Sequence, residues 1–280
     1  MLTYFISDLH LDARCPLTTN KAVLRKSFEE LYNQFFLPAE AVSIAGDIAD
    51  DDFTFVTFCE FIAEKYKQVY IIFGNHDLTV RGSFGDVDGF MKWKTTEDKL
   101  DYIQIALLAY PNVHLLDGNV VDGFGGTMGM CDFTYDRYEG RPYDTVGTWH
   151  NEWYDGRHWN YMGQDPIKIW ESEEAKMDDL VKAAPKVMLT HFFPTQLGIQ
   201  DQFVDTYKTA WYCFDGTKFL EQLPDTTIWQ CGHTHGCIDT RWMDKNGKGH
   251  RIICNTLGLP HETFPFAMFK EAKIFLIDIV

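Results

Sequence analysis

Residues 41–77 read AVSIAGDIADDDFTFVTFCEFIAEKYKQVYIIFGNHD, and this stretch indicates the fold class. Its two apolar runs, AVSIA from Ala41 and QVYIIF from Gln68, have the length and the branched or aromatic side chains of buried strands. Between them, apolar side chains recur at helix spacing from Phe53 to Lys67, after three aspartates that can cap a helix N-terminus. The stretch therefore predicts a strand, a helix and a second strand of a layered α/β protein.

The same pattern continues along the rest of the chain. Three further buried strands are predicted by the runs TYFI from Thr3, KVMLT from Lys186 and TTIWQC from Thr226. One helix is expected from Asn20, which can act as its N-cap, until Pro38 stops it. Another is expected over 165–184, with Asp165 as its cap and a proline in its first turn.

Hairpin signals mark the later parts of the chain. The stretch HLLDGNVVDGFGGTMGM, from His114, contains two Asp-Gly turns, and RWMDKNGKGHRIICNT, from Arg241, contains Asn-Gly. The final residues KIFLIDIV predict one more strand. Alternating strands and helices followed by hairpins predict an α/β fold with four αββα layers, in which two mixed β-sheets pack face to face and helices flank them.

Length and composition indicate an ordinary globular protein. A chain of 280 residues allows one large or two small domains, and we expect a single domain over 1–280 with an aromatic-rich insertion at about 133–163. The first residues lack a signal-peptide pattern and no segment is long and apolar enough to cross a membrane, so no membrane association is expected. Seven scattered cysteines without a CxxC pair, and the absence of an N-x-S/T sequon, fit a cytoplasmic location.

The formal net charge of −16 restricts the class of ligand. Affinity for nucleic acid backbones comes largely from Lys and Arg, so nucleic acid is not an expected partner. Small phosphorylated substrates remain compatible, because two metal dications reverse the local field inside a pocket. The charge therefore predicts a small phosphorylated substrate and leaves the oligomeric state open.

Each of the five apolar runs ends in residues that can bind a metal ion. These residues are Ser7-Asp8-Leu9-His10, Gly46-Asp47, Gly74-Asn75-His76-Asp77, His191 and Gly232-His233-Thr234-His235. The carboxyl ends of strands in open α/β sheets form the crevice where ligands bind, so one crevice can collect them all. Residues two apart in extended chain point the same way, which gives Asp8 with His10, and His233 with His235, the spacing of a chelate. Mixed carboxylate, imidazole and amide donors favour manganese, iron or zinc over calcium.

In this arrangement the sequence resembles the calcineurin-like metallophosphoesterase superfamily. Five motifs of that family occur in order between Asp8 and His235, as DLH, GDIAD, GNHD, a lone His after a strand, and GHTH. Any one motif is weak evidence, whereas the ordered set is specific. The resemblance implies a metal-dependent phosphoesterase with a dinuclear centre, in which a hydroxide that bridges the metals is the nucleophile and manganese is the favoured metal, with iron, zinc or nickel as alternatives.

Carried over by resemblance, two sets of ligands share one carboxylate. One metal would be held by Asp8, His10, Asp47 and His235, and the second by Asp47, Asn75, His191 and His233. The resemblance gives His76 a different role, in which it hydrogen-bonds the phosphate and protonates the departing alkoxide. Asp77 is expected to orient that imidazole, because a working histidine needs a partner that fixes its tautomer.

Two features have readings that the sequence leaves open. Asp50 matches the last position of the family's GDxxD motif, but it can equally cap the following helix, and it is not included among the ligands. The segment 133–163 is crowded with tyrosine and tryptophan. It can form a lid whose aromatic rings stack on a flat substrate group, or a loop packed on the flank of the domain or against another subunit.

Departures from related patterns narrow the activity. The GDIADDD stretch lacks the phosphate-binding Arg of protein phosphatases, and Asp50 stands where purple acid phosphatases have a tyrosine ligand. The pattern is most similar to bacterial phosphodiesterases, so a small phosphodiester, such as a cyclic nucleotide, or a phosphomonoester is the expected substrate. The alternatives are a nuclease of the Mre11 or SbcD kind, which should be basic, and a non-catalytic scaffold, which should have lost site residues.

Overall fold

The computed structural model describes residues 1–80, 93–135, 137–138, 141–142, 144–204, 206, 208–262 and 272–280. Within these ranges the α-helices are α1 (Leu11–Arg14), α2 (Lys21–Phe35), α3 (Asp52–Ala63), α4 (Thr96–Leu107), α5 (Thr145–Glu152), α6 (Tyr154–His158), α7 (Pro166–Ala183) and α8 (Thr217–Gln222). Short 3₁₀ helices are η1 (His76–Leu78), η2 (Met162–Gln164), η3 (Gln196–Gly198), η4 (Asp201–Phe203), η5 (Thr209–Trp211) and η6 (Ala272–Phe275).

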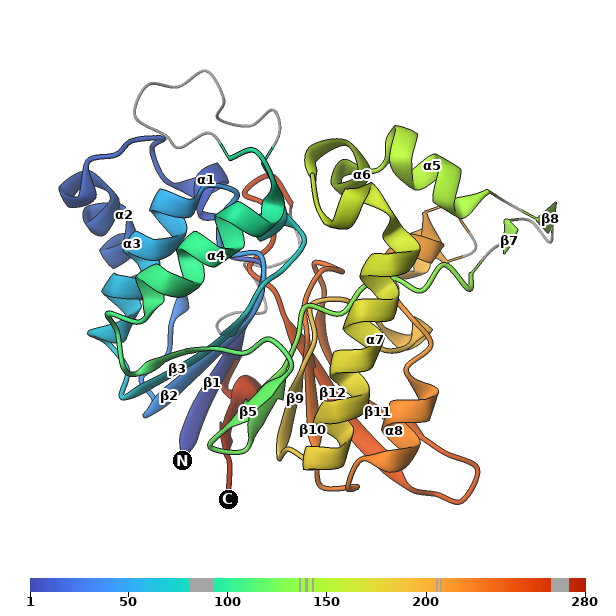
Figure 1. Cartoon of the computed structure of the whole chain (residues 1–280). Coiled ribbons are helices and arrows are strands. Elements are labelled where there is room, and N and C mark those ends of the chain that lie inside the picture. Colours follow the sequence, from blue (N-terminus) through green and yellow to red (C-terminus); the bar gives the residue numbers. More distant parts are fainter. Residues whose placement is uncertain are drawn as a thin grey trace.

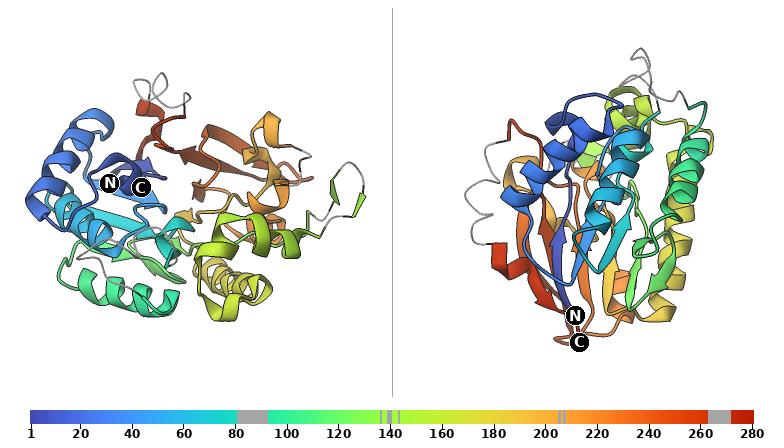
Figure 2. Two further views of the ribbon diagram at one scale, coloured as in Figure 1. Left: turned by 90° about the horizontal axis from the view of Figure 1, so that it is seen from above. Right: turned by 90° about the vertical axis from the view of Figure 1, so that its left-hand side faces the viewer.

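One sheet has five strands in the order β13-β1-β2-β3-β4. Its strands are β1 (Leu2–Ile6), β2 (Ala41–Ala45), β3 (Gln68–Ile72), β4 (Val113–Leu115) and β13 (Leu276–Asp278). Strands β1 to β4 run parallel, and β13 is antiparallel to β1. The chain therefore ends beside the strand with which it begins, and the two termini lie together in Figure 2.

The other sheet has six strands in the order β11-β12-β10-β9-β6-β5. Its strands are β5 (Asn119–Val121), β6 (Phe124–Gly126), β9 (Val187–Leu189), β10 (Ile228–Cys231), β11 (Cys237–Met243) and β12 (Gly249–Asn255). The four central strands are parallel, while hairpins place β11 and β5 antiparallel at the edges. A separate small hairpin pairs β7 (Arg137–Tyr138) with β8 (Arg141–Pro142).

The layers follow the predicted αββα order. In Figure 1, helices α2, α3 and α4 cover the outer face of the five-stranded sheet, and α7 and α8 cover that of the six-stranded sheet. All five residues of β2 are buried, as expected for a strand covered on both faces. The predicted fold of two mixed sheets between helices is confirmed. Among the described residues, none of the helices combines the length and the apolar character needed to cross a membrane.

The predicted helices are present, and side chains cap their N-termini. Asn20 caps α2 by accepting from the backbone amide of Ala22, and Asp165 caps α7, which has a proline in its first turn. The cap of α3 is Asp51, which accepts from the amide of Thr54. This assignment leaves Asp50 without a capping role and available to the functional site.

Helices α1, α4, α5, α6 and α8 were not predicted. Helix α4 carries mixed polar and apolar side chains with little amphipathic contrast, and the cap at Thr95 is its clearest local signal. Helices α5 and α6 lie in the aromatic-rich segment 133–163, of which residues 136, 139–140 and 143 fall outside the description. Trp149 in α5 and Trp159, which directly follows α6, are fully buried, so this segment packs into the body of the protein. The single-domain interpretation stays a prediction.

A buried polar contact joins the two sheets. Gln230 on β10 donates from Nε2 to the carbonyl oxygens of Ile6 (3.0 Å) and Ser43 (3.1 Å), on β1 and β2 of the other sheet. Its Oε1 accepts from the Ser43 hydroxyl. Buried amide and hydroxyl groups without partners are costly, so this contact fixes how the sheets align.

Replacement of Gln230 by Ala should lower the free energy of unfolding by about 2–3 kcal/mol, because it leaves the Ser43 hydroxyl and two buried carbonyl groups without their partner. Urea denaturation followed by circular dichroism measures the change. Gln222→Ala, on the exposed surface of α8, is the matched control and should change stability by less than about 0.5 kcal/mol. Equal stabilities for the two variants would contradict the role of Gln230.

Candidate metal centre

The polar residues that follow the central strands of both sheets meet at one edge of the fold. Asp8 and His10 follow β1, Asp47 follows β2, and Asn75 and His76 follow β3. From the other sheet, His191 follows β9, and His233 and His235 follow β10. Parallel strands end at the same edge, and the two sheets pack with these edges together. The structure therefore brings all of the predicted site residues of both sheets into one region.

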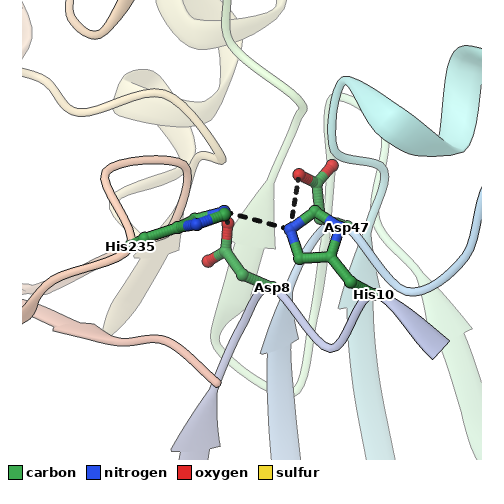
Figure 3. A group of neighbouring side chains, drawn as sticks. All are labelled: Asp8, His10, Asp47 and His235. Carbon is green, nitrogen blue, oxygen red and sulfur yellow. Dashed lines mark hydrogen bonds and ion pairs between the residues drawn. The ribbon is translucent and has the colours of Figure 1, made fainter. Parts of the chain in front are cut away.

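The first group consists of Asp8, His10, Asp47 and His235, whose potential ligand atoms all lie within 4.8 Å of one another. His10 Nε2 lies 3.0 Å from His235 Nε2 and 3.7 Å from Asp47 Oδ2, and His235 Nε2 lies 3.5 Å from Asp8 Oδ1. Figure 3 shows His235 approaching from the opposite side to the three residues of the first sheet. The four side chains surround a common point.

The second group contains Asp47 again, with His191 and His233. His191 Nε2 lies 3.2 Å from Asp47 Oδ2. The side-chain oxygen of Asn75 completes this group, because it lies 2.9 Å from both His191 Nε2 and His233 Nδ1. The two groups correspond to the two ligand sets that the family resemblance implies, and Asp47 is common to both.

Hydrogen bonds outside the second group orient its imidazoles. His191 Nδ1 lies 2.8 Å from the carbonyl oxygen of Ala45, and His233 Nε2 lies 3.0 Å from that of Trp211. A carbonyl oxygen only accepts, so these nitrogens carry the protons. The other ring nitrogen of each histidine therefore faces the centre and, in the neutral ring, offers its lone pair there, as metal-ligating histidines do.

His235 is oriented by Glu262, a residue that sequence analysis missed. His235 Nδ1 lies 2.7 and 2.9 Å from the two carboxylate oxygens of Glu262. The backbone amide of Leu259 donates to the same carboxylate at 2.6 Å, which holds it in place. His235 Nε2 is consequently directed toward Asp8 and His10.

Two observations indicate that these residues fit divalent cations. Asp8 Oδ2 is fully buried and has no hydrogen-bond partner among the described residues, which is costly for a carboxylate oxygen unless another group binds it. The facing nitrogens of His10 and His235 can share one proton at most, whereas a cation between them would satisfy both lone pairs. Oxygen and nitrogen donors in this mixture suit manganese, iron or zinc.

The backbone at the site is unusual. Five of the candidate ligands, none of them glycine, have a backbone in the left-handed region, with φ between 43° and 66°. They are Asp8, His10, Asp47, His233 and His235. Such conformations cost free energy and persist only where the surrounding structure enforces them. Gly74 permits the close approach of two loops, since a Cβ there would lie 2.2 Å from Asp47 Oδ1. The chain therefore holds these side chains in place before any ligand arrives.

Charges inside the site shift its pKa values. Burial alone would raise the pKa of Asp47, but the imidazoles of His191 and His76 lower it well below its usual range. Burial tends to lower the pKa of His191, and the carboxylates of Asp47 and Asp8 raise it to about 9. Burial, followed by the neighbouring charge of His76, lowers the pKa of His10. Asp47 is thus an anion at neutral pH, which is the form in which a carboxylate binds metal ions.

Asp77 does not contact the His76 ring, in contrast to the expectation that it orients this imidazole. Its carboxylate is fully buried and accepts from four backbone amides. These donors are Asp47 (3.0 Å), Ile48 (2.9 Å), Ala49 (3.0 Å) and Gly74 (2.7 Å). The 3₁₀ turn of η1 directs Asp77 inward and His76 outward, so adjacent residues serve different purposes. Asp77 holds the two ligand-bearing loops together.

Asp50 contacts the His76 imidazole instead. Its Oδ1 lies 2.9 Å from His76 Nδ1, and its Oδ2 accepts from the hydroxyl of Tyr154 at 2.5 Å. The Tyr154 ring also stacks on the imidazole, with 4.4 Å between ring centroids. Burial would lower the pKa of His76, but the carboxylates of Asp47 and Asp50 raise it to about 10. His76 is therefore a cation at neutral pH and can donate a proton from its other nitrogen.

Comparison with known proteins identifies the family. The family model described as "Calcineurin-like phosphoesterase" matches residues 1–237. The chain belongs to this family. It is a metal-dependent phosphoesterase, and the family implies a dinuclear divalent metal centre for which the two groups are candidate ligands. A search of the curated proteins finds no match.

Solved structures support the fold of this phosphoesterase. A phosphopantetheinyl hydrolase from Mycobacterium tuberculosis superposes with a TM-score of 0.64. The superposition covers 95% of this chain and 94% of the other, at 15% sequence identity. At that identity the likeness concerns the fold alone.

Residues of the aromatic-rich segment of the phosphoesterase orient Asn75 in the second ligand group. Sequence analysis did not predict this support. Asn75 donates from Nδ2 to Asp155 at 2.8 Å, and this bond turns its Oδ1 toward the imidazoles. Trp159 donates from Nε1 to the carbonyl oxygen of Asn75 at 2.8 Å. Asp155 is fully buried, and burial raises its pKa to about 6. These contacts join residues 80 or more positions apart, so no local pattern in the sequence predicts them.

The centre opens into a pocket of about 550 Å³. Its lining combines the ligand groups with aromatic and polar residues: Asp47, Asn75, His76, Trp153, Tyr154, Gln200, Phe203, Tyr212, His233, Thr234, His235, His261 and Glu262. The volume is in the range of small-molecule sites. The segment 133–163 therefore both packs into the fold and contributes to the pocket wall, which combines features of the two readings that the sequence left open.

Replacement of Asp155 by Ala should weaken metal binding at the second group by about 10- to 100-fold, because the Asn75 amide loses the acceptor that orients it. Isothermal titration of the metal-free phosphoesterase with Mn²⁺ measures the affinity. Asp155→Asn, which keeps an acceptor, should lie closer to the parent protein. Asp179→Ala, an exposed change on α7, is the control. Equal affinities for all four proteins would show that Asp155 has no positioning role.

Proposed function

We propose that this phosphoesterase hydrolyses a small phosphodiester, such as a cyclic nucleotide, or a phosphomonoester, with two divalent cations at the centre. The proposed ligands are Asp8, His10, Asp47 and His235 for one cation and Asp47, Asn75, His191 and His233 for the other. Manganese is the favoured metal, with iron, zinc or nickel as alternatives. The observation that carries this proposal is the shared Asp47, whose one carboxylate faces both groups.

Each group at the centre has a chemical task in this proposal. When bound, the two cations would lower the pKa of a water so that a hydroxide between them attacks phosphorus, and would offset the charge of the phosphate oxygens. His76, protonated at neutral pH and held by Asp50, donates a proton to the departing alkoxide. Asp50 and Tyr154 act through His76 and keep its ring in one orientation.

Charge favours a small substrate over a polynucleotide. The chain has a formal net charge of −16, and the pocket residues that the structure describes include neither Lys nor Arg. A nuclease needs cationic side chains along the nucleic acid backbone. The scaffold alternative predicts lost site residues, whereas here the proposed donors are present and gather into the two groups. Neither alternative has an observation in its favour.

The protein reconstituted with Mn²⁺ should hydrolyse bis(p-nitrophenyl) phosphate and lose this activity when a chelator removes the metal. Elemental analysis should find two metal ions per chain. Asp47→Asn should lower kcat/KM by at least about 100-fold, because it weakens the ligand common to both cations, and Asp179→Asn should not change it. A metal-loaded protein that is inactive on a panel of phosphodiesters and phosphomonoesters would overturn the proposal.

Replacement of His76 by Asn should affect substrates according to their leaving group. For glycerol phosphate, whose alkoxide needs a proton, we expect kcat to fall by about 100-fold. For p-nitrophenyl phosphate, whose phenolate departs readily without a proton, the loss should be several-fold. Asp50→Asn should give the same pattern with smaller losses, since it acts through His76.

The metal content of the His76 and Asp50 variants, measured by elemental analysis, is the internal control and should match the parent protein. Loss of metal together with activity would assign His76 to the ligand shell. Equal losses of kcat on both substrates would show that His76 is not the proton donor.

A further inference from the structure

Three aromatic side chains form one wall of the pocket beside the metal centre. This aromatic wall consists of Trp153, Phe203 and Tyr212, which come from two distant parts of the chain. Phe203 stacks on Tyr212, with ring centroids 5.4 Å apart and an interplanar angle of 25°. Trp153 meets Tyr212 edge to face at 5.6 Å and 79°. The rings therefore form a corner with two differently oriented apolar surfaces.

The aromatic wall begins at the metal centre itself. The ring centroid of Tyr212 lies 5.5 Å from that of His233, and the centroid of Trp153 lies 6.4 Å from it. A phosphate held at the centre would consequently place the next atoms of its ester group against these rings. The indole of Trp153 is fixed from behind, since it packs on Trp211 at 4.8 Å and donates from Nε1 to Asp155 at 3.1 Å. Its polar group is thus engaged away from the pocket.

The charges around the pocket limit what else the substrate can carry. Of the described lining residues none is Lys or Arg, while Glu262 adds a carboxylate at the rim. The cations at the centre can neutralise one phosphate. Apart from the cations and His76, which serve the phosphate at the centre, a second phosphate or a carboxylate on the ester group would meet no Lys or Arg among the described lining residues. It would instead meet the carboxylate of Glu262.

From these contacts we infer that the aromatic wall is a binding site for a planar, uncharged ring, an aryl group or nucleobase, attached to a single phosphate group. This inference rests on the proposed function and names the class of ester group that the centre accepts. Offset or edge-to-face packing on Trp153 and Tyr212 favours a flat ring over an alkyl chain of similar size. The corner between the two rings can contact one face and one edge of such a group.

Phosphonates are used to test the inference, because they have no leaving group and so report binding alone. Methyl-, butyl- and phenylphosphonate each carry one anionic group on a bond that hydrolases of phosphate esters do not cleave. Their inhibition constants are measured against bis(p-nitrophenyl) phosphate hydrolysis by the Mn²⁺-loaded protein. We expect phenylphosphonate to bind about 10-fold more tightly than methylphosphonate and several-fold more tightly than butylphosphonate. 4-Carboxyphenylphosphonate, with its second anionic group, should lose this advantage.

Trp153→Leu and Tyr212→Leu keep apolar bulk but remove the flat surface. In each variant the ratio of the methyl- to the phenylphosphonate inhibition constants should fall from about 10 to below about 3. Trp242→Leu on β11, a partly buried tryptophan outside the pocket, is the control and should leave the ratio unchanged. Two wall variants are measured, so that a folding defect in one of them leaves the other as a test.

The outcomes separate this inference from the proposed function. Metal-dependent hydrolysis with equal affinity for the three phosphonates, or an unchanged ratio in both wall variants, overturns the aromatic site and leaves the phosphoesterase centre intact. Equal affinity for butyl- and phenylphosphonate overturns the preference for a planar ring. Absence of metal-dependent hydrolysis, with no phosphonate bound, overturns the proposed function itself.

Discussion

One buried carboxylate holds the two loops on which the candidate metal centre depends. Asp77 accepts from backbone amides on both sides, three in the loop after β2 and one in the loop after β3. These loops carry Asp47, Asn75 and His76, which have to face the same point. This tie helps to maintain the left-handed backbone at Asp47 and the close approach of the two loops at Gly74. The geometry of the centre is therefore a property of the folded chain.

The acidity of the protein and its chemistry on phosphate esters are compatible because charge is reversed locally. The surface of a chain with a formal net charge of −16 repels anions, and the described pocket residues contain neither Lys nor Arg to oppose this. Divalent cations at the centre provide that reversal within a few ångströms. In the proposed function, attraction of a phosphate ester is thus conditional on metal.

The fold and the residues of the candidate centre could be predicted from the sequence because both depend on local patterns. Apolar runs define the strands, and parallel strands end at one edge, so Asp8, Asp47 and His191 had to come together. Asp77 was given the wrong partner, because adjacency in sequence does not say where a side chain points in a 3₁₀ turn. Asp155 and Glu262 were not predicted, since each contacts the candidate ligand that it orients across a long separation in sequence.

The short segment around helix α6 both supports a candidate metal ligand and lines the pocket, and a substitution there can affect both roles at once. Asp155 and Trp159 support Asn75, while Trp153 and Tyr154, beside them, line the pocket. A protein that diverges toward another ester group by changing this segment would risk its metal at the same time. Duplicated copies with new specificity are thus expected to vary first in the opposite half of the wall, near Phe203 and Tyr212, which lies outside the segment that orients Asn75.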